Sequence, residues 1–374
     1  MSNSVPYLNL KTQHDPLKKE ILTAIEQAID SNTFVLGPEV EAFEEEFSQY
    51  SKSKYTVALD SGTAALHIAL AVLDLQPGDE VITTPFTFAA TTWGISYVGA
   101  RPVFVDIEEN AYNIDPKKIE NAITKKTKAI LPVHLYGHPC DMDPIVELCN
   151  SYKLHLIEDA AQAHGARYKG QPIGTFGESA AYSFYPTKNL GACGEAGALT
   201  TDDPKIAERA RSLRNHGSTK RYYHEEIGYN YRMDAFQAII LRLKLKKLPE
   251  WTLDRLRTVA LYHQLLSSTS LKEFIKLPIQ APWAESAYHL FTLTTPYRDQ
   301  LAAYLKSRNI GFSNHYPVPL HLQSCYKSLG GKVGDFPIAE RIAQEVINIP
   351  LYPGITKNEV ETVASVIHEF FETI

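Results

Sequence analysis

The chain has 374 residues, 44% of them hydrophobic and 21% charged, which is the composition of an ordinary globular protein. Its formal net charge of -6 argues against a general nucleic-acid-binding surface, because such surfaces carry a basic surplus. The four cysteines form no C-x-x-C pair, so we expect reduced thiols in a cytoplasmic protein, and neither a disulfide framework nor a zinc site.

The sequence predicts no signal peptide and no membrane span. Residues 1–6 lack the basic and apolar regions of a signal peptide. The longest uncharged run, residues 81–100, contains Pro85 and Gly94, so it is predicted to form strand, loop and helix.

The first predicted elements are two helices. Asp15 and Pro16 are expected as a helix N-cap and first-turn proline, and apolar residues recur at helical spacing as far as Ile29. After a Gly-Pro break, an acidic helix is predicted over residues 39–50.

Short apolar runs then alternate with helical patterns. This alternation predicts an α/β fold with a mostly parallel sheet that helices cover on both faces. The predicted strands are residues 55–59, 80–84, 102–105, 129–133, 154–157, 180–184 and 198–201.

A domain change is predicted near residue 248, where a long helical pattern over residues 234–248 gives way to looser alternation. Because the chain is longer than one hydrophobic core usually fills, we predict a large domain over residues 1–247. A smaller C-terminal α/β domain is predicted over residues 248–374. Its expected elements are a strand at 288–295, a surface loop at 314–319, and helices at 300–308 and 357–371.

Lys188 lies directly after a predicted strand, between Pro186 and a glycine-rich stretch. Loops beyond the carboxyl ends of strands form ligand crevices in open α/β sheets, and a lysine there can form a Schiff base with a carbonyl compound. Because a free lysine has a pKa of about 10.4, burial or a nearby cation must lower that pKa before the amine reacts at pH 7. The alternative is an ordinary surface lysine.

Asp159 ends another predicted strand and is followed by small residues and Gln162. An Asp in this place can bind a metal, orient a base or pair with a cationic heterocycle such as the pyridinium ring of pyridoxal 5′-phosphate (PLP). It can equally cap the helix that follows.

Further segments suit a flat, phosphorylated cofactor. The run from Asp60 to Thr63 contains Gly62 and precedes a predicted helix, whose first amides can bind phosphate, although such a run is also an ordinary helix cap. Ser183 is a second candidate for the phosphate. Phe88 can stack on a ring or lie in the core. The sequence contains no dinucleotide fingerprint, P-loop, H-E-x-x-H or G-x-S-x-G motif.

Taken together, these segments resemble the DegT/DnrJ/StrS family of sugar aminotransferases, which have fold type I of the PLP-dependent enzymes. The resemblance covers nearly the whole chain. It rests on the runs Phe34 to Glu39, Asp60 to Thr63, Thr84 to Phe88, Pro132 to Gly137, Glu158 to Gln162, Ser183 to Asn189, Gly228 to Asn230 and His315 to Pro317. The departures from the family pattern concern substrate detail, and they are Thr187, Glu195 and Tyr231.

The resemblance implies a role for each matching residue toward the cofactor. Lys188 would hold PLP as an internal aldimine and move the proton, and Asp159 would pair with the pyridine nitrogen. Gln162 would lie against the cofactor, with Phe88 stacked on the opposite ring face. The 5′-phosphate would be bound by Gly62, Thr63 and Ser183.

Three residues are implied to act at the edge of the site. Asn230 would reach the cofactor phosphate of a neighbouring subunit, which implies a homodimer with active sites at its interface. His315 and Tyr316 would contact the sugar nucleotide. No metal is implied.

We therefore expect a PLP-dependent transaminase that takes the amino group of an amino acid, L-glutamate by expectation, and transfers it to a nucleotide-linked keto-sugar. Pyridoxamine phosphate (PMP) would carry the amino group between the two half-reactions. Residues 183–198 and 315–323 look most like members that act at sugar C-3 on a dTDP or UDP carrier, feeding lipopolysaccharide or another glycan. The alternatives are transamination at C-4, a PLP-dependent lyase or desulfurase, and a non-catalytic or regulatory member of the same fold.

Overall fold

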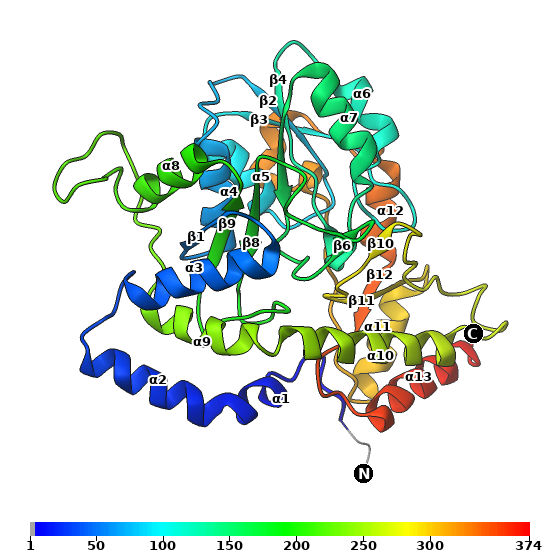
Figure 1. Cartoon of the computed structure of the whole chain (residues 1–374). Coiled ribbons are helices and arrows are strands. Elements are labelled where there is room, and N and C mark those ends of the chain that lie inside the picture. Colours follow the sequence, from blue (N-terminus) through cyan, green and yellow to red (C-terminus); the bar gives the residue numbers. More distant parts are fainter. Residues whose placement is uncertain (1–3) are drawn as a thin grey trace.

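The computed structural model describes residues 4–374, so residues 1–3, which belong to the segment assessed as lacking a signal peptide and to the predicted first domain, lie outside it. A seven-stranded sheet forms the centre of the chain, in the order β1-β9-β8-β5-β4-β2-β3 (Figure 1). Every strand predicted for the first domain is present. The strands are β1 Tyr55–Leu59, β2 Glu80–Thr83, β3 Arg101–Phe104, β4 Thr127–Ile130, β5 His155–Asp159, β8 Ser179–Ser183 and β9 Gly197–Thr201.

The sheet is mostly parallel, and β9 is its one antiparallel strand. It pairs antiparallel with both β1 and β8, whereas the pairs β2–β3, β2–β4, β4–β5 and β5–β8 are parallel. Two consecutive strands can run parallel only if a crossover connection, usually a helix, joins them. The loop at residues 184–196 contains no helix, so the chain comes back beside β8 in the opposite direction.

Helices cover both faces of the sheet, as the alternation predicts. In β1, Val57 and Leu59 pack with α4, α5 and α8, while Ala58 packs with α3, α7 and α9. This two-residue period is that of a strand buried on both faces. The covering helices are α3 Pro38–Ser51, α4 Gly62–Ala71, α5 Ala90–Tyr97, α6 Pro116–Ala122, α7 Met142–Tyr152, α8 Pro204–Arg214 and α9 Ala235–Leu245.

Two helix boundaries differ from the predictions. Asp15 is not an N-cap, because the Asn9 side chain accepts from the Lys11 amide at 3.1 Å and the helical chain begins with α1, Lys11–His14. Asp15 and Pro16 lie in a 3₁₀ turn before α2, Lys18–Asp30.

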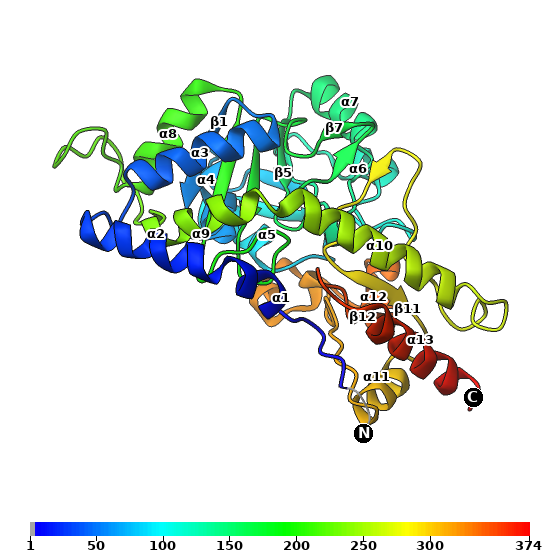
Figure 2. The same cartoon turned by 60° about the horizontal axis from the view of Figure 1, so that its bottom comes forward.

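The helical pattern predicted over residues 234–248 is present as α9, and its continuation toward Trp251 and Arg257 is a separate helix, α10 Leu248–Leu266. Pro249 stands in the first turn of α10, where its missing N–H and its ring do not permit the preceding helix to continue unbroken. Figure 2 shows α2 lying along α9, with α10 leading on toward the C-terminal part of the chain.

The C-terminal segment forms its own apolar cluster, which α10 shares with a two-stranded sheet and two helices. Val5 belongs to the same cluster, since it bridges to Ile310. The division at residue 248 stays a prediction. The elements of this segment are β11 Phe291–Thr294, α11 Arg298–Ser307, α12 Pro337–Glu345, β12 Val346–Ile349 and α13 Lys357–Phe371, with residues 314–319 in a loop.

Across residues 4–374, none of the helices combines the length and the apolarity that crossing a membrane requires.

Candidate functional site

The predicted site residues other than Asn230 gather at one edge of the large sheet. Asp159 is the last residue of β5 and Ser183 the last of β8, while Gly62 begins the helix that follows β1. Because β1, β5 and β8 run in the same direction, their carboxyl ends meet at one edge, where open α/β sheets bind ligands.

Asp159 is a buried carboxylate held by two hydrogen bonds. Its side chain is 4% exposed; Thr91 Oγ1 donates to Oδ2 at 2.8 Å and the Ala161 amide to Oδ1 at 3.1 Å. Burial raises the pKa of Asp159, and the Thr91 and Ala161 hydrogen bonds and the charge of Lys188 oppose that rise. Because burial disfavours the charged form of Asp159, a cationic group placed against this carboxylate would be stabilised.

Lys188 is a partly buried lysine on the loop after β8. Burial lowers its pKa to about 8, although the neighbouring charge of Asp159 opposes the shift. At pH 7 the neutral amine is then present in roughly one molecule in ten, compared with one in a few thousand for a free lysine. The loop is held by backbone hydrogen bonds from the Lys188 amide to Tyr185 and from the Ala192 amide to Phe184, each 2.8 Å long.

Gln162 links this centre to the C-terminal segment. Its Nε2 donates to the Tyr316 hydroxyl at 3.1 Å, and its Oε1 accepts from the Tyr136 amide at 2.7 Å. The Tyr136 hydroxyl donates to the carbonyl of His315. Phe88, with 53% of its surface exposed, lies over Tyr316 with ring centroids 6.0 Å apart. The structure therefore brings all four predicted residues Gln162, Phe88, His315 and Tyr316 to one place.

The phosphate candidates lie where α4 meets the end of β8. Ser61 caps α4 by accepting from the Ala64 amide at 3.1 Å, so the first amides of the helix, at Gly62 and Thr63, remain for a ligand. A Cβ at position 62 would lie 2.6 Å from the Cβ of Ser183. Only glycine permits this approach, which puts Ser183 beside the helix N-terminus.

Asn230 is not brought to the other predicted residues within the chain. Its side chain is exposed and accepts from Arg232 Nε at 3.0 Å. The neighbouring rings of Tyr229 and Tyr231 stack 5.0 Å apart, and Tyr231 is 3.1 Å from Nδ1 of the α4 residue His67. The backbone on either side is therefore anchored, while the Asn230 side chain is exposed.

Sequence reasoning missed several residues around this centre, namely Thr91, Tyr136, Asn189, His289 and Asn348. Thr91 is 68 positions from the carboxylate that it holds. Tyr136 and Asn189 did offer a signal, because both stand in runs on which the family resemblance rests.

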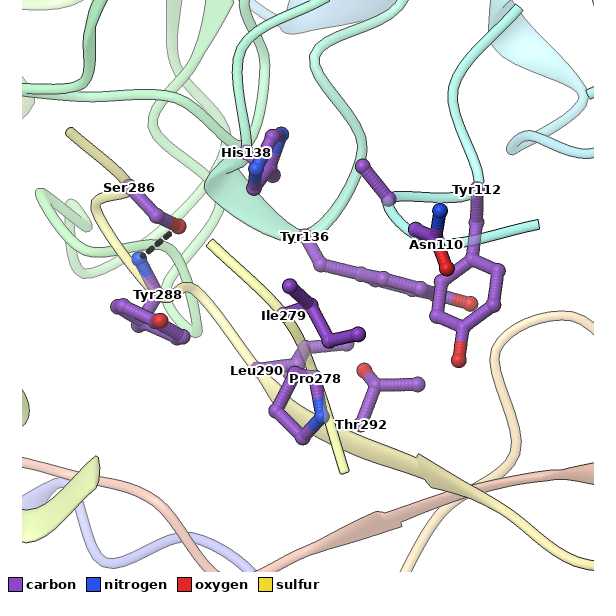
Figure 3. Close-up of a pocket in the computed structure, with 11 residues that line it drawn as sticks. Asn110, Tyr112, Tyr136, His138, Pro278, Ile279, Ser286, Tyr288, Leu290 and Thr292 are labelled. Atoms are coloured by element: carbon purple, nitrogen blue, oxygen red, sulfur yellow. Dashed lines mark hydrogen bonds between the residues drawn. The ribbon is translucent and has the colours of Figure 1, made fainter. Parts of the chain in front are cut away.

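A small pocket lies behind Tyr136, on the side facing the C-terminal segment. Figure 3 shows the Tyr136 side chain extending between Tyr112 and the residues around Leu290. The cavity volume is about 20 Å³, which is room for about one water molecule. This pocket is too small for a sugar, and it shares only Tyr136 with the contacts described above. In the part of the chain that the structure describes, no group of three His, Cys, Asp or Glu side chains is arranged to hold a metal ion.

Comparison with known proteins gives consistent matches over the whole chain. The sequence model of the DegT/DnrJ/EryC1/StrS aminotransferase family matches residues 15–368. The dTDP-3-amino-3,4,6-trideoxy-alpha-D-glucose transaminase of Streptomyces venezuelae is 44% identical over 370 residues, which span 99% of this chain and 97% of the relative.

Solved structures agree with that match. The crystal structure of S. venezuelae DesV in complex with a ketimine intermediate superimposes with a TM-score of 0.96 at 43% identity, covering 99% of both chains. That of NtdA from Bacillus subtilis with bound PMP gives a TM-score of 0.91 at 32% identity, covering 100% of this chain and 86% of the other.

Proposed function

We propose that this chain, which belongs to the DegT/DnrJ/EryC1/StrS aminotransferase family, transfers the amino group of an amino acid to carbon 3 of a nucleotide-linked keto-sugar. Family membership makes it a PLP-dependent transaminase, whose cofactor alternates between PLP and PMP. The observation that carries the proposal is the convergence of Lys188, with its lowered pKa, and buried Asp159 at one edge of the sheet.

The residues present fit PLP. The cofactor has an aldehyde, a ring nitrogen that can be cationic, and a phosphate, and the site offers a partly neutral amine, an uncompensated buried carboxylate and a helix N-terminus. Bound PLP supplies an electron-accepting ring next to the amine that is transferred.

Lys188 and Asp159 divide the chemistry between them. Lys188 would hold the cofactor through Nζ and, once released, take up and return the proton of the reacting carbon through that nitrogen. Asp159, with Oδ2 fixed by Thr91, would keep the ring nitrogen protonated. Keeping the amine within reach of the donor carbon that loses the proton and of the cofactor carbon that receives it would combine proximity with acid–base catalysis.

The remaining predicted residues would bind and orient. Phe88 would cover one ring face and Gln162 would lie against the ring edge, where the bond to the Tyr136 amide fixes its orientation. Because Tyr316 and His315 connect to Gln162 and Tyr136, the loop at residues 314–319 would place the sugar nucleotide next to the cofactor. The phosphate would bind at Gly62, Thr63 and Ser183.

The choice of acceptor rests on the relatives. The S. venezuelae relative is named for an amino group at carbon 3 of a dTDP-sugar, which supports a 3-keto sugar on dTDP, with UDP as the second carrier to test. L-glutamate is the proposed donor, and the product would enter lipopolysaccharide or another glycan.

We propose also that the enzyme is a cytoplasmic homodimer. The exposed Asn230 and the exposed aromatic side chains of Tyr222 and Tyr223 nearby support a second subunit on this side. All four cysteines are free thiols, in keeping with a reducing compartment.

The test uses the recombinant protein loaded with PLP. Borohydride reduction followed by peptide mass spectrometry should find the cofactor on Lys188. Incubation with L-glutamate and dTDP- or UDP-linked 3-keto and 4-keto sugars should then give an amine at carbon 3, located by NMR. Attachment to another residue would reject the site, and an amine at carbon 4 would reject the proposed regiochemistry.

A further inference from the structure

His289 is a buried histidine beside the site, just before β11. It is 7% exposed, and its peptide N–H donates to the Tyr136 carbonyl at 2.8 Å. A Cβ placed on Gly137 would lie 2.9 Å from the His289 peptide nitrogen and 3.0 Å from the Gln162 carbonyl oxygen. His289 therefore packs against the backbone of the strand-end loops that carry the candidate cofactor residues.

Asn189 connects His289 to the lysine loop. Asn189 Nδ2 donates to the Ala287 carbonyl at 2.9 Å, which identifies the donor end of this amide and leaves Oδ1 as the acceptor. Oδ1 lies 3.1 Å from Nδ1 of His289. Because a carbonyl oxygen only accepts hydrogen bonds, Nδ1 carries the hydrogen. A neutral ring then keeps an unprotonated Nε2.

The surroundings of His289 keep it uncharged. Burial lowers its pKa well below the usual value, and the charges of Lys188, Arg255, His315 and His164 act in the same direction. Its partner is an amide and not a carboxylate, so no anion at Nδ1 stabilises an imidazolium. Arg255 is tied to the His289 carbonyl at 3.2 Å, which also fixes the backbone there.

We propose that His289, locked by Asn189 as the neutral Nδ1–H tautomer, is a positioning residue for Lys188. The hydrogen bond from His289 holds Asn189, the residue next to Lys188, against the C-terminal segment. The neutral ring places no second positive charge beside the Lys188 amine. A charged ring here would disfavour the protonated form of Lys188 further. The inference rests on the proposed function only in taking Lys188 as the residue that holds the cofactor.

The tautomer can be observed directly in the wild-type, cofactor-free protein. Long-range ¹⁵N–¹H spectra of protein labelled with [¹⁵N]histidine, with His289→Asn used to assign the signal, should show Nδ1 protonated and Nε2 unprotonated at pH 7. An Nε2–H tautomer or an imidazolium would overturn the proposal. This measurement does not depend on any transaminase reaction, so its failure is distinct from failure of the proposed function.

Two nearly isosteric variants separate the hydrogen bond from the packing. His289→Asn retains a donor at the Nδ1 position, whereas His289→Leu does not. We expect His289→Leu to weaken PLP attachment to Lys188, measured by borohydride trapping at limiting PLP, about tenfold, with His289→Asn within about twofold of wild type. The same pair at His263, a partly buried histidine of α10 that contacts Phe291, is the matched control and should change nothing. Equal trapping by both His289 variants would refute positioning.

The charge state of the ring is tested through Lys188 itself. Competitive acetylation of the cofactor-free protein as a function of pH, quantified on the Lys188 peptide, gives the pKa of that amine. The proposal expects the same value in wild type and His289→Asn, because a neutral group replaces a neutral one. A higher value in the variant would mean that a positive charge had been removed, and would overturn the neutral assignment even if His289→Leu failed to fold.

Discussion

The lysine centre, which comprises Lys188 and Asp159, and the segment around Asn230 have different local structures, although both are assigned to one site. Asp159 is 4% exposed and has hydrogen-bond partners from Thr91 and Ala161 within the same chain. Asn230 has an anchored backbone and an exposed side chain. The first region is complete in a single chain, while the second presents a fixed polar group outward. Chemistry and assembly are thus assigned to separate regions, which can be perturbed independently.

The largest effect is expected from removing the amine. Lys188→Ala should abolish covalent cofactor attachment and transamination, because no other group at this edge replaces Nζ. Mass spectrometry after borohydride treatment measures the loss, and dimer formation by analytical ultracentrifugation should be unchanged. A cofactor adduct that survives in the variant would contradict the assignment.

Asp159→Asn should leave the fold intact and reduce turnover by about 10²–10³-fold, since an amide cannot stabilise a protonated ring nitrogen. Steady-state kinetics measure kcat, and circular dichroism checks the fold. A kcat near that of wild type would mean that the carboxylate is only a structural group held by Thr91.

The lysine centre also predicts a pH dependence of stability in the cofactor-free protein. Burial lowers the pKa of Lys188 to about 8, whereas the unfolded chain leaves it near 10.4. Between these values the unfolded state binds more protons, so the free energy of unfolding rises with pH. We expect about 2 kcal/mol of this rise between pH 7.5 and 10 to be lost in Lys188→Met, after allowance for partial solvent exposure.

Denaturant titrations at the two pH values measure that difference. Lys244→Met is a positive control, because burial also lowers the pKa of Lys244 to about 8. If the free energy of unfolding rose equally with pH in Lys188→Met and in wild type, the pKa of Lys188 would not be lowered by folding.

The smallest effect is expected at the outward-facing residue. Asn230→Ala should weaken PLP affinity about tenfold, the loss of one hydrogen bond to a charged group, and leave kcat at saturating PLP nearly unchanged. Equilibrium binding of PLP followed by absorbance measures the affinity. In mixed dimers of Asn230→Ala and Lys188→Ala subunits, the intact Lys188 of one subunit should lie against the intact Asn230 of the other, so one site should be unaltered and one doubly altered. Unaltered PLP affinity in the Asn230→Ala protein would argue against a contact across the interface.

Much of the fold followed from local signals, whereas the roles proposed at the centre of the site came from the family resemblance. Strand-helix alternation predicted the sheet because each strand is a short apolar run bounded by turns. Lys188 and Asp159 were candidates because one follows a strand and the other ends one, where open α/β sheets form crevices, but their roles toward the cofactor came from the family resemblance. The reversal at β9 was not predictable from its own residues, because direction depends on the connection and not on the strand.

The supporting contacts could not be read in the same way. The Asn189–His289 bond joins positions 100 residues apart, and Tyr136 reaches the loop at His315 across 179 residues. Such contacts are set by how the C-terminal segment docks on the sheet. The periodicity of a single segment does not reveal this docking. The break between α9 and α10, just before Pro249, shows that even a continuous helical pattern can be divided there.

The contact between Gly62 and Ser183 has a practical meaning for engineering. A β-carbon at position 62 would lie 2.6 Å from that of Ser183, so any larger residue would separate α4 from β8. Libraries that seek a new acceptor should therefore leave this glycine unchanged and diversify residues 315–323. Sequence variation is then confined to residues proposed to bind the sugar nucleotide, while the residues proposed to bind the cofactor phosphate stay unchanged.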